Sequence, residues 1–67
     1  MGTPNRVALA RAEAGLTQAQ LAAAVGASLR TINRIEKGQR PRLTLAVRLA
    51  RTLGVDLVEL FDDEDAA

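Results

Sequence analysis

The chain has 67 residues with a net charge of +1, and 48% of its residues are hydrophobic although only 1% are aromatic. It contains no cysteine and no histidine, which excludes disulfides and thiolate metal sites and removes the commonest general base, so we expect neither an enzyme nor a metal or cofactor site. A chain of this length supports one domain, and its alanines and leucines, which outnumber its β-branched and aromatic residues, predict an all-α fold.

Glycines at the ends of apolar-periodic segments divide the chain into short helices, because each suits the left-handed residue that follows a helix. These glycines are Gly15, Gly26, Gly38 and Gly54. Helix starts are also visible: Thr17 and Gln20 form a capping box, Ser28 can cap the next helix, and Asp56 precedes the last. The expected helices cover residues 5–14, 18–25, 29–37, 43–53 and 57–61.

At 100° per residue, three of the expected helices have an apolar inward face. The predicted inward residues are Val7, Ala10, Arg11 and Ala14 in the first helix, Leu21, Ala22 and Val25 in the second, and Ala46, Leu49, Ala50 and Leu53 in the fourth. Either Leu43 or Leu45 completes the stripe of the fourth helix. In the first helix, Leu9 and Glu13 lie on the opposite side.

Segment 29–37 has one basic face and one apolar face. Its polar face consists of Arg30, Asn33, Arg34 and Lys37, and the opposite face of Ser28, Ile32, Ile35 and Glu36. Arginine can bind guanine and asparagine can bind adenine in the major groove, so this face predicts contact with DNA, with an ordinary solvated helix surface as the alternative. Because Glu36 faces inward, where a carboxylate needs a partner, we expect an ion pair with Arg11.

The small net charge conceals a strong asymmetry along the chain. Residues 1–55 carry all nine basic side chains and only two acidic ones, whereas residues 56–67 carry six acidic side chains. A basic body is expected of a protein that meets a polyanion through one face. Residues 62–67 are expected to form a flexible acidic tail.

Residues 18–37 resemble the helix-turn-helix motif. The core, small-residue and turn positions of that motif are occupied by Leu21, Ala22, Val25, Gly26, Ile32 and Ile35. A small residue at position 22 leaves room for the crossing helix, and Gly26 permits the positive φ of a tight turn. Ala27 departs from the motif, because the turn position it occupies usually carries a valine or threonine.

The resemblance extends over residues 5–61 to the compact five-helix, lambda-repressor-like domain of the XRE family, the Cro and phage-repressor type. It is carried by the further segments NRVALAR (5–11), GLTQ (15–18), IEKG (35–38) and LGVDL (53–57). In that family the arginine at the place of Arg11 pairs with the glutamate at the place of Glu36, which agrees with the pairing inferred from the helical wheel.

The resemblance implies a division of roles among residues that contact DNA. Base edges would be read by Leu29, Arg30, Thr31, Asn33 and Arg34. Phosphates would be contacted by Thr17, Gln18, Ser28, Lys37, Arg40 and Arg42. Leu29 stands where a polar residue is common, and it could contact a thymine methyl or pack against the preceding helix. Arg40 and Arg42 could instead serve solubility.

The implied function is sequence-specific regulation of transcription by a repressor that reads a near-palindromic operator through the major groove. The implied partners are double-stranded DNA and a second copy of the chain. The dimer interface is predicted at Val55, Leu57, Val58 and Phe61, with Leu9 as an alternative. Leu57 and Phe61 could instead complete the core of the monomer.

Two alternatives remain open. The first is an antitoxin that binds a toxin through its acidic tail and represses its own promoter. The second is a protein-interaction module without affinity for DNA, which the basic face argues against. Since no apolar run approaches the roughly 20 residues that span a bilayer and the N-terminus lacks the apolar stretch of a signal peptide, we expect a cytoplasmic protein without membrane contact.

Overall fold

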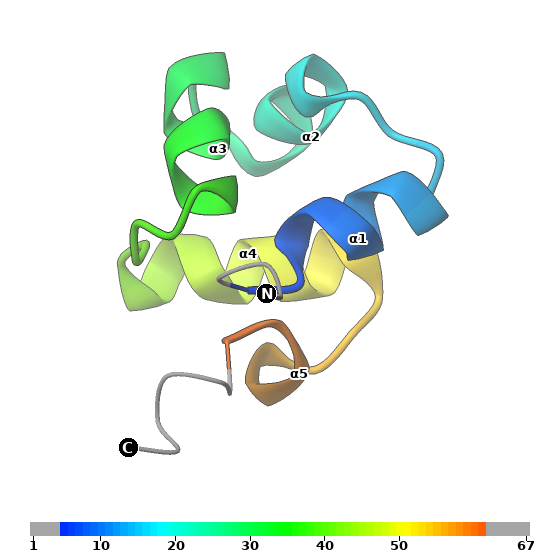
Figure 1. Cartoon of the computed structure of the whole chain (residues 1–67), viewed down its shortest axis with the longest axis vertical. Helices are drawn as coiled ribbons and strands as arrows, with labels where there is room; N and C mark the ends of the chain where they lie inside the picture. The colour runs from blue at the N-terminus through cyan, green and yellow to red at the C-terminus, as the bar shows by residue number, and fades with distance from the viewer. Residues whose placement is uncertain (1–4, 62–67) are drawn as a thin grey trace.

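The computed structural model describes residues 5–61, and these residues form five helices and no strand (Figure 1). In chain order the helices are α1 (Val7–Glu13), α2 (Gln18–Val25), α3 (Leu29–Glu36), α4 (Leu43–Leu53) and α5 (Leu57–Phe61). The predicted all-α fold is confirmed. No helix of this described part has the length and apolarity needed to cross a membrane. The predicted acidic tail lies outside the described residues.

Helix α1 is shorter than predicted, and Asn5, which the prediction placed inside it, precedes it. The side chain of Asn5 accepts a hydrogen bond from the N–H of Val7 at 3.0 Å and donates one to the carbonyl of Ile35 at 2.8 Å. This buried amide joins the start of α1 to the last turn of α3. At the other end Ala14 caps the helix and is exposed, so the prediction that it belongs to the inward face is wrong.

Helices α2 and α3 begin at the residues that the capping signals predict. The hydroxyl of Thr17 accepts a hydrogen bond from the N–H of Gln20 at 3.0 Å, and the side chain of Gln20 accepts one from the N–H of Thr17 at 2.9 Å. The hydroxyl of Ser28 accepts from the N–H of Thr31 at 3.1 Å. Between the two helices Gly26 has a φ of +73°, which residues with a Cβ rarely adopt. The turn between α2 and α3 therefore depends on this glycine.

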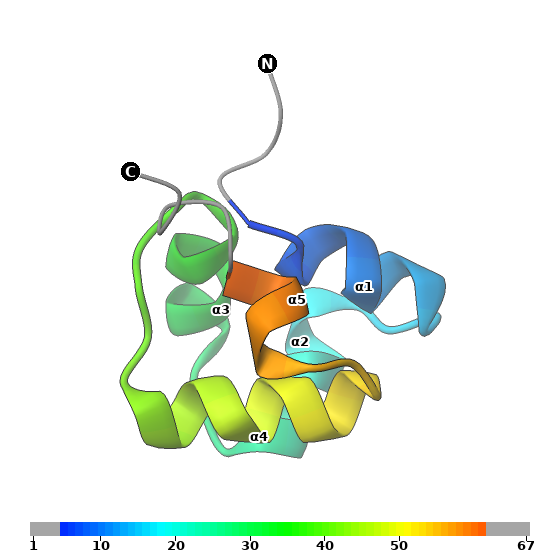
Figure 2. The same cartoon turned by 90° about the horizontal axis from the view of Figure 1, so that it is seen from below.

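Helix α4 forms the base on which α1, α2 and α5 pack. It contacts α1, α2 and α5, whereas α3 contacts α1 and α2. In Figure 1, α2 and α3 lie on one side of α4 and α5 lies on the other. Seen from below, α5 lies between α4 and α1 (Figure 2). The two ends of the described chain meet there, because the N–H of Arg6 donates to the carbonyl of Leu60 at 3.0 Å.

The core is aliphatic apart from one aromatic ring. Its buried hydrophobic residues are Val7, Ala10, Leu21, Ala22, Val25, Ile32, Ile35, Ala46, Leu49, Ala50, Leu60 and Phe61. Leu45 packs against this core while Leu43 is 70% exposed, so it is Leu45 that completes the apolar stripe of α4. Phe61 is only 8% exposed and completes the core of the monomer, so it offers little surface to the dimer interface in which we also placed it.

Candidate nucleic-acid interface

Helix α3 turns its aliphatic side chains to the core and its basic side chains to solvent. Ile32 and Ile35 are 0% and 1% exposed, and the helix buries them against α1 and α2. Arg30 and Arg34 are exposed, and within residues 5–61 their side chains take part in no hydrogen bond or ion pair. The orientation predicted from the helical wheel is therefore confirmed. Both guanidinium groups are free to meet another molecule.

The other residues predicted to read bases differ in exposure. Thr31 and Asn33 are half-buried. The hydroxyl of Thr31 lies 2.9 Å from that of Ser28, so both hydroxyls are engaged at the N-terminus of α3. Leu29 is 51% exposed, which leaves an apolar surface for a thymine methyl at the first position of the helix.

The N-terminus of α2 presents backbone donors to solvent. The N–H groups of Gln18 and Ala19 belong to the first helical turn and have no acceptor within residues 5–61. Unsatisfied donors of this kind, together with the positive end of the helix dipole, bind anions such as phosphate. Thr17 is exposed beside them, although its hydroxyl is occupied by the capping box.

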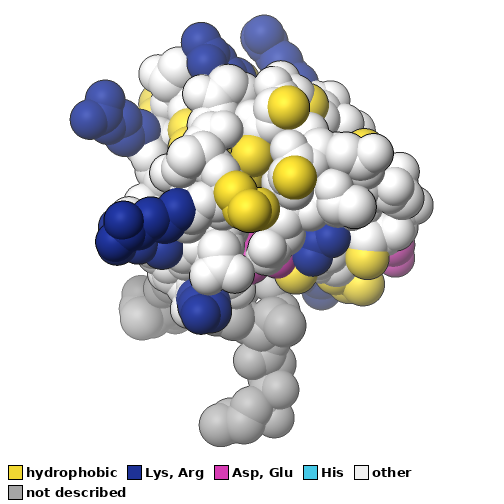
Figure 3. Space-filling view, turned by 90° about the horizontal axis from the view of Figure 1, so that it is seen from above, with side chains coloured by type: hydrophobic (Ala, Val, Ile, Leu, Met, Phe, Trp, Pro, Cys, Tyr) yellow, Lys and Arg dark blue, Asp and Glu magenta, His cyan; other side chains and the backbone are white. Residues whose placement is uncertain are grey.

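The segment after α3 carries further positive charge. Lys37, Arg40 and Arg42 are all exposed, and Arg42 stands at the N-cap position of α4 without a side-chain capping bond. We call the set Arg30, Arg34, Lys37, Arg40 and Arg42 the basic face. On the side of the molecule formed by α2 and α3, lysine and arginine side chains project along the left and upper edges around a hydrophobic centre (Figure 3).

The acidic residue of α3 is removed from the basic face by an ion pair. Arg11 Nε lies 2.6 Å from Glu36 Oε2, and Arg11 Nη2 donates to Glu36 Oε1 at 3.2 Å. The two side chains are 20% and 9% exposed. The hydrogen bond to Glu36 raises the pKa of the Arg11 guanidinium above its ordinary value, although partial burial opposes the shift. The ion pair thus joins α1 to α3.

One contact at this interface could not be found from the sequence. Gln18 Nε2 donates a hydrogen bond to Glu36 Oε1 at 2.9 Å, so a residue predicted to contact phosphate is held by the ion pair. The two residues belong to different helices, and the wheel of one helix does not reveal its rotation relative to another.

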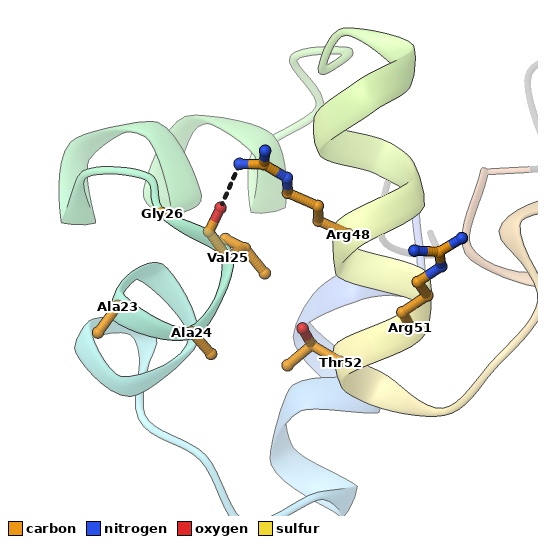
Figure 4. A pocket seen from close by; sticks show the side chains of 7 residues that line it. All are labelled: Ala23, Ala24, Val25, Gly26, Arg48, Arg51 and Thr52. Carbon is orange, nitrogen blue, oxygen red and sulfur yellow. Dashed lines mark hydrogen bonds between the residues drawn. The ribbon is translucent and has the colours of Figure 1, made fainter.

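Arg48 makes a second contact that the sequence did not indicate. Its Nη1 donates to the carbonyl of Val25 at 3.4 Å, where a positive charge suits the negative end of α2. Figure 4 shows Arg48 reaching this carbonyl across an open hollow of about 450 Å³, while Arg51 points away from it. The hollow is lined by Ala23, Ala24, Val25, Gly26, Arg48, Arg51 and Thr52. None of these is a predicted DNA contact.

An apolar surface lies beside the basic face, at the start of α4 and on α5. Leu43 and Val58 are each 70% exposed, whereas Val55 and Leu57 are half-buried. A shallow groove of about 230 Å³ adjoins Leu43. It is lined by Arg40, Pro41, Leu43, Ala46, Leu57 and Phe61. Of the predicted interface residues, Val58 is thus the most exposed, and Leu43 is a further exposed apolar residue that the prediction left out.

Known proteins are similar to this chain over most of its length. A family model described as helix-turn-helix matches residues 7–60. A protein of Methanothermobacter thermautotrophicus named as an HTH-type transcriptional regulator is 48% identical over 60 residues, which cover 85% of this chain and 87% of that protein. Proteins so named from Methanocaldococcus jannaschii and Archaeoglobus fulgidus are 42% and 41% identical, over 91% of this chain and 94% and 91% of their own lengths.

Proposed function

The chain belongs to the XRE-type helix-turn-helix family of DNA-binding transcriptional regulators, and from this premise we propose that it is a repressor that reads a near-palindromic operator as a homodimer. The observation that carries the proposal is the exposure of Arg30 and Arg34 on a helix whose isoleucines are buried. Such a helix can enter the major groove without disturbing the core. Repression by occupying a promoter requires nothing beyond this binding.

In the proposed complex, different parts of the interface have different tasks. Helix α3 lies in the major groove, where Arg30 and Arg34 contact base edges. The free N–H groups at the start of α2 and the cations that follow α3 contact phosphates, which fix the position of the protein but carry no sequence information. A second copy binds the other half-site, about 34 Å away along the duplex.

Neither alternative function is favoured by the described residues. The antitoxin hypothesis depends on the acidic tail, which lies outside residues 5–61. A protein-interaction module has no need of a helix with exposed cations and a carboxylate turned inward. DNA binding accounts for both features, because an exposed carboxylate on this helix would repel phosphate.

Salt dependence tests the proposed contact with phosphates. Replacing Lys37 or Arg42 by glutamine should weaken binding to every DNA sequence and reduce the slope of log affinity against log salt by about 0.9 for each bound copy, the value for one phosphate contact. Fluorescence anisotropy with labelled duplexes at several salt concentrations measures this slope. Arg51→Gln removes the same charge from an exposed position of α4 and should leave the slope unchanged. Binding of the unaltered chain that is absent or insensitive to salt contradicts the proposed function.

The surface around Leu43 and Val58 supports the proposed dimer. Both are large aliphatic side chains that are 70% exposed, and burying such surface against a second copy is favourable. The groove beside Leu43 also adjoins Arg40, so the proposed interface continues into the basic face. This continuity would hold two copies of α3 on the same side of the dimer.

Val58→Asp should abolish cooperative binding of two copies of the chain to one operator. We expect the affinity for a duplex with two half-sites to fall by about 10- to 100-fold, because linked binding raises the effective concentration of the second site. The affinity for a single half-site and the thermal stability should stay the same. Analytical ultracentrifugation with DNA should show one bound copy in place of two. Leu9, which is 52% exposed, belongs to the other candidate surface. If Leu9→Asp lowers the affinity more than Val58→Asp does, the dimer interface lies on α1 instead.

A further inference from the structure

Side chains from three helices meet at the carboxylate of Glu36. Its Oε1 accepts hydrogen bonds from Gln18 Nε2 at 2.9 Å and from Arg11 Nη2 at 3.2 Å, while its Oε2 accepts one from Arg11 Nε at 2.6 Å. An ion pair that only joined α1 to α3 would have no need of the third member. Gln18 is also the first residue of α2, next to the free backbone donors.

The inference that follows rests on the proposed binding of DNA. We propose that Glu36 is a positioning residue for that binding, which holds the side-chain amide of Gln18 in place to contact a backbone phosphate. Arg11 neutralises the carboxylate in this arrangement. The ion pair thus takes part in DNA binding as well as in the fold.

The hydrogen-bonding capacity of the Gln18 amide supports this role. A primary amide has two N–H groups, and one of them is used by Glu36. The second remains for a phosphate oxygen, beside the backbone N–H groups of Gln18 and Ala19. A glutamine side chain without such a contact samples many rotamers and has to be ordered when it binds. The bond to Glu36 orders the half-buried Gln18 beforehand.

The charges explain why Arg11 is needed at the same point. A bare carboxylate in contact with a phosphate-binding amide would repel the phosphate. Arg11 donates two hydrogen bonds to Glu36, so the pair has no net charge. Its third contact, from Nη1 to the carbonyl of Leu16 at 2.9 Å, fixes the segment that leads into α2. Arg11 and Glu36 together therefore determine where the N-terminus of α2 and its side chain lie.

Two double variants separate positioning from stability. Arg11→Met with Glu36→Met removes the pair and the acceptor for Gln18, whereas Arg11→Met with Glu36→Gln retains an amide oxygen at position 36. Both leave the net charge unchanged, and replacing both members of a buried ion pair by uncharged side chains is often tolerated. Thermal melting followed by circular dichroism identifies a temperature at which every variant is folded, and the binding measurements are made at that temperature.

The expected result is a loss of affinity that depends on the acceptor. The double-methionine variant should bind DNA about two- to tenfold more weakly than the unaltered chain, which corresponds to ordering one flexible side chain on binding. The loss should be equal for specific and nonspecific duplexes, because phosphates carry no sequence information. The methionine–glutamine variant should recover most of it.

Adding Gln18→Ala closes the thermodynamic cycle. It should weaken binding in the unaltered chain and in the methionine–glutamine variant, and weaken it clearly less in the double-methionine variant, where Gln18 is no longer held in place. Equal losses in all three backgrounds overturn the inference while leaving the proposed function intact. If the double-methionine variant does not fold, Arg11→Met with Glu36→Leu takes its place, and a loss from Gln18→Ala in that background as large as in the unaltered chain overturns the inference. Absence of salt-dependent binding by the unaltered chain overturns the proposed function and the inference together.

Discussion

Replacing Ile32 by alanine is expected to lower the free energy of unfolding by about 3 kcal/mol, within the roughly 2–5 kcal/mol typical of such truncations. Ile32 is fully buried at the centre of α3, and alanine would leave a cavity beneath the helix that carries the predicted base contacts. A domain of this size has a total stability of only about 3–10 kcal/mol. The variant should therefore be partly or wholly unfolded at 37 °C, as urea denaturation followed by circular dichroism would show.

Leu29 provides the matched control on the same helix. It is 51% exposed, so Leu29→Ala removes apolar atoms that are largely in contact with water and should cost less than about 1 kcal/mol. The comparison tests the rotation of α3 about its own axis, on which the position of every predicted base contact depends. If the two substitutions cost the same, the helix does not present the basic face described above.

The ends of the helices could be predicted because their signals are local. The capping box at Thr17, the cap at Ser28 and the left-handed glycines at positions 26 and 54 act on neighbouring backbone groups. Accordingly the predicted bounds of α2, α4 and α5 match the structure. Helix α1 was predicted too long because Asn5 lies before the helix, where its side chain accepts from the N–H of Val7 and donates to the carbonyl of Ile35. Asn5 and Ile35 are 30 residues apart in the sequence, and a contact between such distant residues produces no periodic pattern that could reveal it.

Side chains at the edges of apolar stripes were harder to place. On the wheel, Leu43 and Leu45 lie at opposite edges of the apolar stripe of α4, and only Leu45 packs against the core. Phe61 was open to two interpretations for a similar reason, since the last helix of a small domain can cover its own core or that of a partner. The angle at which α5 packs on α4 decides the matter, and no single helix encodes it.

In the candidate site, too, features within one helix could be predicted from the sequence, whereas contacts between helices were harder to predict. Periodicity within α3 was enough to place Arg30 and Arg34 outside and Glu36 inside. It also suggested Arg11 as a partner, because the inward faces of α1 and α3 each contain one charge. The contact of Gln18 with Glu36 depends on where α2 begins relative to the end of α3, which follows from the turn at Gly26 and the packing of both helices.

Arg34→Ala is expected to weaken binding to the preferred operator by about 1–3 kcal/mol, or roughly 5- to 150-fold. The guanidinium is exposed and bonded to nothing within the described residues, so its removal should leave the folding stability unchanged. Selection from random DNA supplies the operator, and a second selection with the variant should show a relaxed preference at one base pair in each half-site. Arg30→Ala should relax a different position, because the two side chains are separated by one helical turn.

Arg51→Ala gives the comparison that separates base reading from simple attraction to DNA. It removes the same charge from the exposed surface of α4, on a side chain that points away from the turn between α2 and α3 (Figure 4). A general electrostatic effect would weaken binding of all duplexes to a similar extent in both variants. Base reading predicts instead that Arg34→Ala lowers the ratio of specific to nonspecific affinity, while Arg51→Ala preserves it. If the two variants preserve that ratio equally, α3 attracts DNA without reading its sequence, and specificity must come from deformation of the duplex.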